Sequence, residues 1–122
     1  MITENYVSFE VAKLLKEKGF NEKVSRWYVA NSPQEGVVTI GFGDKQLYIN
    51  APTQQMAMKW LREVHSLYIW IGHSAGKSLS WYYEIHGISD GKVKHIGGIQ
   101  YGSYELACGE AIKYCLENFI EL

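Results

Sequence analysis

Five residues in the middle of the chain have the spacing of a serine-hydrolase nucleophile. They read Gly72-His73-Ser74-Ala75-Gly76, which fits the G-x-S-x-G pattern of the nucleophile elbow. Asp90 and His95 follow Ser74 in the acid-then-histidine order of those enzymes. The elbow requires a helix directly after the serine, but residues 79–85 alternate like a strand. We therefore expect a hairpin loop here, and the alternative function is a small hydrolase acting through this loop.

The same loop imitates a phosphate-binding loop when Lys77 and Ser78 are included. A phosphate-binding loop places four residues between its glycines and opens a helix, whose N-terminus helps to hold the phosphates. Here three residues separate Gly72 from Gly76, and the residues that follow are strand-like. The sequence therefore predicts no nucleotide and no other cofactor.

Residues that bind metals or transfer protons are scattered along the chain. The histidines are His65, His73, His86 and His95. No two of them have the i,i+4 spacing that is typical of a helical metal site. Glu63 and Glu84 are the acids nearest the expected sheet, and nothing brings them together for acid–base chemistry. We therefore predict no catalytic residue, no metal ligand and a protein that is not an enzyme.

Composition narrows the class of protein further. The chain has 122 residues, of which 47% are hydrophobic, and this balance fits one globular domain over residues 1–122. Lys and Arg number 12 against 13 Asp and Glu, so nucleic-acid binding, which draws on clustered positive charge, is unfavoured. The N-terminus lacks the pattern of a signal peptide, and no apolar run approaches the ~20 residues of a membrane span. We expect no contact with a membrane.

The two cysteines indicate a reducing compartment. Cys108 and Cys115 lie seven residues apart in an expected helix, which separates them by about 10 Å and is too far for a disulfide between them. Two small core residues on one helix face are the better interpretation. We therefore expect a cytoplasmic protein.

A repeated start predicts three helices. Ser8, Thr53 and Ser103 are each followed by any residue, then Glu or Gln, then an apolar residue and Ala. Each hydroxyl can accept a hydrogen bond from a backbone N–H group that the first helical turn leaves unpaired. Apolar stripes with helical spacing continue from these starts and predict helices over residues 9–18, 54–64 and 104–119.

Two groups of strands are predicted between the helices. The ranges are 24–30, 37–42, 45–50, 67–72, 79–86 and a less regular 93–99. Strands joined by short turns should pair as antiparallel hairpins, for example the second and third strands across Gly43-Asp44. The order α-β-β-β-α-β-β-(β)-α predicts an α+β fold, in which one antiparallel sheet of five or six strands has three helices mainly on one face.

Alternation along the strands also predicts an unusual outer face for this sheet. The residues that should face the helices are mostly aliphatic, whereas the opposite side carries five rings. These rings are Tyr28, Tyr48, Tyr68, Trp70 and Tyr82. The chain itself could cover them, or they could be exposed singly, which is normal for globular proteins. As one patch they would exceed what monomers commonly expose and would indicate a binding surface.

We expect this surface to engage a protein partner or a second copy of the chain without catalysis. Tyr and Trp suit protein contacts because they combine a large area with a polar tip and little rotamer entropy. Single-stranded nucleic acid could also stack its bases on the rings. Arg26 is the one firm cation expected on that face, so this alternative is less favoured.

The three helical stretches carry a resemblance. They read N-Y-V-S-F-E-V-A-K-L-L-K-E-K-G-F over residues 5–20, A-P-T-Q-Q-M-A-M-K-W-L-R-E-V-H over residues 51–65 and Y-E-L-A-C-G-E-A-I-K-Y-C-L-E-N over residues 104–118. In these stretches the chain resembles a family of short uncharacterised proteins from gut Bacteroides genomes and their prophage or mobile regions. The resemblance implies a bacterial, phage-related origin. It brings no established activity and transfers no functional residues.

Overall fold

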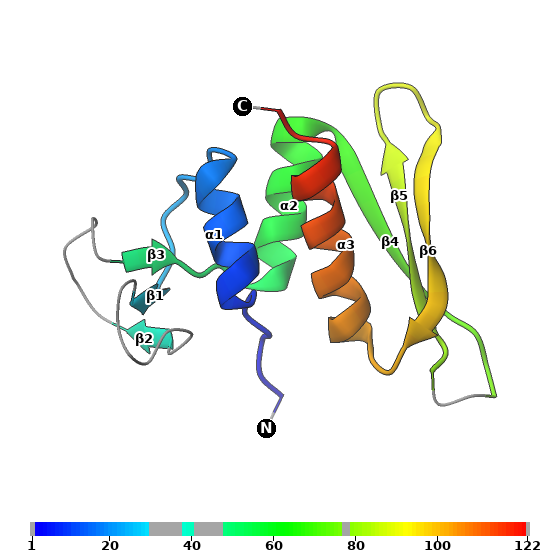
Figure 1. Ribbon diagram of the computed structural model, residues 1–122, viewed down its shortest axis with the longest axis horizontal. Helices are drawn as coiled ribbons and strands as arrows, with labels where there is room; N and C mark the ends of the chain where they lie inside the picture. The colour runs from blue at the N-terminus through cyan, green and yellow to red at the C-terminus, as the bar shows by residue number, and fades with distance from the viewer. Residues whose placement is uncertain (1, 30–37, 41–47, 77–78, 122) are drawn as a thin grey trace.

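The chain folds into three helices and two groups of strands, in the order expected from the sequence. A computed structural model describes residues 2–29, 38–40, 48–76 and 79–121. The elements are α1 (Phe9–Glu17), β1 (Arg26–Val29), β2 (Val38–Ile40), β3 (Tyr48–Asn50), α2 (Gln54–His65), β4 (Leu67–His73), β5 (Trp81–Gly87), β6 (Val93–Tyr101) and α3 (Tyr104–Asn118). In Figure 1 a small sheet stands at one end, followed by α1, then by α2 and α3, and then by a larger sheet. The predicted α+β class is confirmed.

The repeated start does begin all three helices. The side chain of Ser8 accepts a hydrogen bond from the N–H of Val11 at 3.2 Å. Thr53 accepts from Met56 at 3.1 Å in the same way. Ser103 caps α3 by an equivalent bond at 3.1 Å to the N–H of residue 106. The helix starts are therefore set locally, by hydroxyl side chains that satisfy first-turn donors.

The strands form two separate antiparallel sheets, so the prediction of a single sheet of five or six strands was wrong. The first sheet has the strand order β2-β1-β3, and the second sheet has the order β4-β5-β6. The helix α1 contacts β3, whereas α2 and α3 contact the second sheet. Helices thus stand between the two groups of strands (Figure 1). Strands on opposite sides of a helical layer cannot reach each other with backbone hydrogen bonds.

The pairing within the first sheet also differs from expectation. We expected the second and third strands to pair with each other, but β1 lies between them and pairs antiparallel with both. The turn residues Gly43-Asp44 on which that expectation depended lie outside the described residues. Short strands of three or four residues carry little register information, so the sequence could not distinguish these two arrangements.

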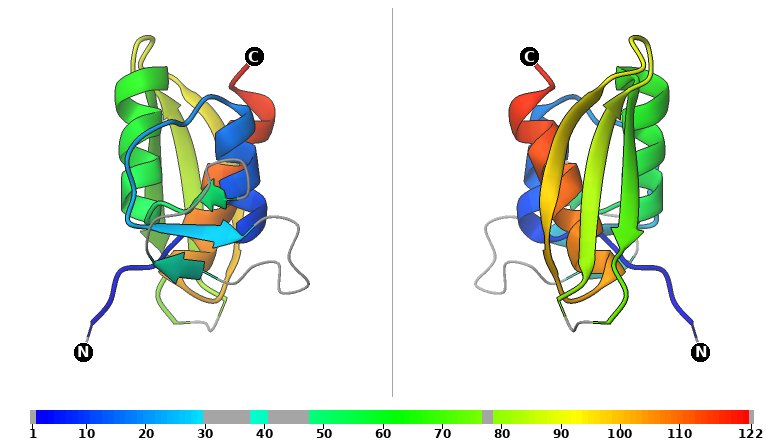
Figure 2. Two further views of the ribbon diagram at one scale, coloured as in Figure 1. Left: turned by 90° about the vertical axis from the view of Figure 1, so that its left-hand side faces the viewer. Right: turned by 90° about the vertical axis from the view of Figure 1, so that its right-hand side faces the viewer.

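The core lies between the second sheet and the helices. Its largest fully buried aliphatic side chains include Leu15 of α1, Leu61 of α2, Ile85 of β5 and Ile112 of α3. α3 is central, because it contacts α1, α2 and all three strands of the second sheet. Among the described residues, no helix lies over the other face of the second sheet, as the right-hand view of Figure 2 shows.

Candidate functional site

The five rings expected on one open face are divided between the two sheets. Tyr28 and Tyr48 belong to the first sheet, whereas Tyr68, Trp70 and Tyr82 belong to the second. Because helices stand between the two sheets, the five rings form no common surface (Figure 1). The expected five-ring face is therefore corrected to a smaller face on the second sheet.

Tyr28 is a core residue and not part of an exposed face. It is 6% exposed, and its ring meets that of Phe9 edge-on at 5.4 Å between centroids. Its hydroxyl donates to the backbone carbonyl of Val7 at 2.6 Å, and burial raises the pKa of its phenol. Tyr48 is half-buried, with its ring 5.5 Å from that of Trp27. In so short a strand as β1, an assignment shifted by one residue exchanges the two faces.

The second sheet has one covered face and one open face, as alternation predicted. On the covered side, Leu67, Ile69, Tyr83 and Ile85 are buried against α2 and α3. On the other side, Tyr68 and Trp70 remain 39% and 40% exposed. The ladder between the strands places a set of residues on this side, which we call the open face: Tyr68, Trp70, Tyr82, Glu84, His86, Val93 and Ile96.

The rings on the open face support one another. Trp70 and Tyr82 meet edge-on with centroids 5.5 Å apart, and Tyr68 lies 6.0 Å from the imidazole of His86. The ring of Tyr82 lies over Gly72 so closely that a Cβ at Gly72 would collide with it. Edge-on and tilted pairs at these distances are favourable arrangements of aromatic rings. The rings therefore hold defined positions on the face.

Glu84 and His86 of the open face contact each other. Nε2 of His86 lies 3.0 Å from Oε1 of Glu84, and both side chains are partly buried among the rings. No residue of the open face as defined above is Lys or Arg. Arg26, the cation expected on an open face, instead lies in the first sheet, with its guanidinium 4.3 Å from the ring of Tyr6. The open face is thus apolar, aromatic and close to neutral.

β6 adds exposed aliphatic residues whose face could not be assigned from alternation in the sequence. Val93 and Ile96 are 52% and 59% exposed, and Ile96 pairs with Glu84 of β5. Two register shifts interrupt the ladder between β5 and β6, which explains why simple alternation fails there. The turn Ser89-Asp90-Gly91 could have indicated the face of Ile96. In a hairpin, residues at equal distances before and after the turn pair with each other, and this rule places Ile96 opposite Glu84.

The hydrolase-like loop is built by packing and turn geometry. Gly72 is required by the overlying ring of Tyr82, and Gly76 adopts the left-handed φ of 99°. The N–H of Ser74 donates to the carbonyl of Ser80 at 2.8 Å, within the antiparallel hairpin of β4 and β5. A strand and not a helix follows the loop, so Ser74 lacks the oxyanion site of an elbow. Lys77 and Ser78, which completed the phosphate-loop pattern, lie outside the described residues.

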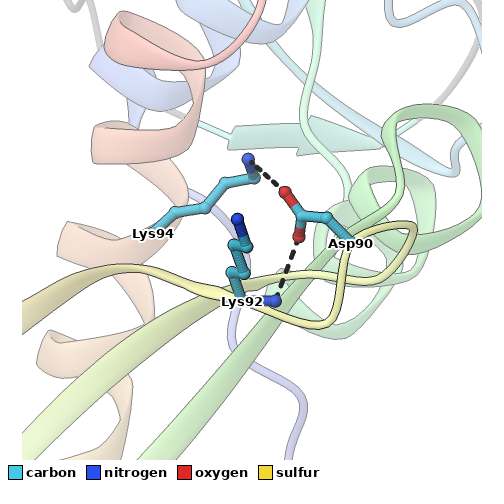
Figure 3. A network of polar contacts seen from close by, with 3 residues as sticks. All are labelled: Asp90, Lys92 and Lys94. Atoms are coloured by element: carbon cyan, nitrogen blue, oxygen red, sulfur yellow. Dashed lines mark hydrogen bonds and ion pairs between the residues drawn. The ribbon is translucent and has the colours of Figure 1, made fainter.

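The acid and the histidine that follow Ser74 in the sequence do not assemble around it. Asp90 lies beyond the far end of β5, a strand of seven residues, which corresponds to a separation of about 20 Å. There it accepts hydrogen bonds from the N–H of Lys92 at 3.0 Å and from Nζ of Lys94 at 3.3 Å (Figure 3). These bonds, that from the Lys92 backbone above all, lower the pKa of Asp90. His95 stacks on the ring of Tyr114 at 3.7 Å between centroids.

His65 has a buried nitrogen without a partner. Its Nε2 makes no hydrogen bond within the described residues, and burial lowers the pKa of the ring, which lies 4.6 Å from that of Trp60. His65 also borders a depression of about 300 Å³ together with Asp90, Lys94 and Phe119. Nε2 has almost no accessible surface, so it faces the protein interior and not this depression. In the described part of the chain no three His, Cys, Asp or Glu residues gather as a metal site would require.

Both cysteines are free thiols buried in α3. Sγ of Cys108 lies 4.0 Å from Sδ of Met58 in the core. Burial raises the pKa of Cys108 to about 11 and that of Cys115 to about 12. The thiolate is the reactive form of cysteine, and these raised pKa values keep both residues in the thiol form near neutral pH.

Among the described residues, no helix combines the length and the apolar character that crossing a membrane requires. Comparisons of the chain with protein-family models, with curated proteins and with solved structures gave no match. The candidate site is therefore defined by its own geometry: an aromatic, aliphatic and nearly neutral face of the second sheet.

Proposed function

We propose that this chain is a non-catalytic interaction domain that binds another protein chain through the open face of the second sheet. The observation that carries the proposal is the exposure of Tyr68 and Trp70 on β4, and of Ile96 on β6, on one face of the second sheet that no described helix covers. Such aromatic and aliphatic area gains free energy when another surface removes it from water. Tyr and Trp are also the residues that most often dominate the energy of protein interfaces.

The charge of the face favours a protein partner over a nucleic acid. Stacking surfaces for single-stranded nucleic acid combine rings with a positively charged groove that follows the phosphates. The open face offers rings but only the paired Glu84 and His86 as ionisable groups besides its two phenols. A protein interface tolerates a neutral, mostly apolar centre well. Hydrolysis through Ser74 has no comparable support, since its acid and histidine lie elsewhere.

Site-specific photocrosslinking tests this proposal. Tyr68→p-benzoylphenylalanine places a photoreactive ring on the open face with little change of shape, and the protein is irradiated in its native cells. We expect a discrete crosslinked protein, either a different chain or a second copy, because an interface holds a partner within reach of the ring. Adding Trp70→Ala should weaken that product strongly, since Trp70 is a neighbouring contact on the same face.

The matched control is Lys16→p-benzoylphenylalanine. Lys16 is exposed on α1, and Figure 1 shows that α1 lies on the side of α2 and α3 away from the second sheet. This control should give no discrete product. Equal products from both positions, or none from position 68, would contradict the proposal. Circular dichroism of the purified variants verifies that each one is folded.

A further inference from the structure

The middle of the open face holds a single carboxylate among rings and aliphatic side chains. Glu84 of β5 lies directly opposite Trp70 of β4 on one side and opposite Ile96 of β6 on the other. Tyr82 and His86 precede and follow it by two residues, so the strand places both on the same face. The side chain of Glu84 is 23% exposed. Any contact that covers the open face will therefore cover this acid at its centre.

The hydrogen bonds of this carboxylate are incomplete. Oε1 of Glu84 lies 3.0 Å from Nε2 of His86, whereas Oε2 makes no hydrogen bond to any described residue. An ionised carboxylate has about four acceptor positions, and water can fill the remaining ones while the face is free. A partner that removes this water must replace it, because a buried carboxylate is strongly unfavourable unless it is paired and hydrogen-bonded.

The ring opposite Glu84 favours a cation over a neutral donor. Residues directly opposite on paired strands have Cβ atoms about 4.5–5.5 Å apart, so a group bound to Glu84 lies beside the indole of Trp70. Cations are attracted to the face of an aromatic ring, and most strongly to that of Trp. Trp70 is 40% exposed, with Tyr82 edge-on to it at 5.5 Å between centroids. With its histidine neutral, the open face carries one negative charge, that of Glu84, and no Lys or Arg.

We infer that the protein bound to the open face places an arginine side chain against Glu84 and Trp70. This contact rests on the proposed function and names the chemistry of the partner: a mostly apolar protein surface with an arginine near its centre. A guanidinium is planar, so it can stack on the indole while its N–H groups donate to the carboxylate. Arginine also joins Trp and Tyr as the residues that most often dominate the energy of protein interfaces.

Titration with a blocked arginine tests this site directly. Nα-acetylarginine amide is added to the isotope-labelled protein at constant ionic strength, and heteronuclear NMR follows the indole N–H signal of Trp70, which Trp70→Phe assigns. We expect a saturable shift with a dissociation constant of about 1–50 mM. Nα-acetylcitrulline amide has almost the same shape without the charge, so it should bind at least about fivefold more weakly.

The variant Glu84→Gln removes the negative charge and keeps the size of the side chain and an oxygen for His86. It should weaken the binding of the blocked arginine by about fivefold. Glu17→Gln is the matched control, because it removes the same charge at an exposed position of α1 and should leave binding unchanged. Combined with Tyr68→p-benzoylphenylalanine, Glu84→Gln should also reduce the crosslinked product, and Glu17→Gln should not.

Any of four results would overturn this inference. They are no saturable shift with blocked arginine up to about 100 mM, equal affinity for the citrulline derivative, a Glu84→Gln variant that binds arginine like wild type, and a crosslink that Glu84→Gln leaves unchanged. If one of them occurs while position 68 still gives a discrete crosslink, the arginine contact fails and the proposed function stands. If position 68 gives no crosslink, the proposed function fails, and the partner named here fails with it.

Discussion

The partly buried imidazole of His65, whose Nε2 is shielded from solvent, should make the stability of the protein depend on pH. Burial holds the pKa of His65 below its ordinary value of 6.5. The unfolded chain therefore takes up a proton at a higher pH than the folded chain, and the free energy of unfolding falls as the pH decreases below about 6.5. As the pH rises above about 6.5, the ring becomes neutral in both states, and this contribution fades.

The variant His65→Phe isolates that effect, because it keeps a ring against Trp60 and removes the titrating group. Urea unfolding between pH 5 and pH 7.5 measures the free energy of unfolding of the variant and of wild type. As the pH falls, the free energy of unfolding of wild type should decrease relative to that of the variant. Subtracting the two curves cancels the other three histidines. A gap between the two free energies that is independent of pH would contradict the lowered pKa of His65.

Each helix start should contribute a similar and separable amount of stability. Ser103→Ala removes the hydroxyl that accepts from the N–H of Leu106 and leaves that donor unpaired at the start of α3. Loss of such a cap costs about 1 kcal/mol, with a usual range of roughly 0.5–2 kcal/mol. Thr53→Ala should have an effect of the same order on α2. Chemical denaturation measures both.

Ser25→Ala is the matched control, because Ser25 is exposed and caps none of the described helices. It should change the free energy of unfolding by less than about 0.5 kcal/mol. If Ser103→Ala changed the free energy of unfolding as little as this control, water would satisfy the N–H of Leu106 equally well. The repeated hydroxyl start would then not stabilise the helix.

At the scale of the whole molecule, contacts between the helices connect the two sheets, and we expect both sheets to unfold as one cooperative unit. Nζ of Lys113 on α3 lies 3.0 Å from Oε1 of Glu10 on α1, and Nε2 of Gln54 at the start of α2 donates to the carbonyl of Glu105 at 3.0 Å. Ile112, in the middle of α3, is fully buried in the shared core. Removing it should weaken both ends of the molecule together.

We expect Ile112→Ala to lower the free energy of unfolding by about 2–5 kcal/mol, because it removes buried methyl groups and leaves a cavity. Hydrogen exchange during urea titration should show β1 and β5 losing protection at the same midpoint. Leu106→Ala is the control on the same helix: Leu106 is 59% exposed, and its loss should cost less than about 0.5 kcal/mol. Separate midpoints for the two sheets would show that they unfold independently.

Much of the local structure could be read directly from neighbouring residues. The three hydroxyl starts cap three helices, and alternation along β4 and β5 correctly separates the exposed Tyr68 and Trp70 from the buried Ile69 and Ile85. These features are encoded at short range: a cap joins residues three apart, and a strand presents alternate residues to opposite faces.

The partners of the strands were decided only by the tertiary structure. The residues in and around β1 do not indicate that helices separate it from the second sheet. They also do not indicate that Tyr28 donates to the carbonyl of Val7 inside the core. The same holds for the exposed Ile96, whose place on the open face depends on a ladder with two register shifts. Sheet pairing and burial depend on contacts between residues distant in sequence. A single strand forms none of the backbone hydrogen bonds of a sheet, and which strand it pairs with is decided only when the whole core packs.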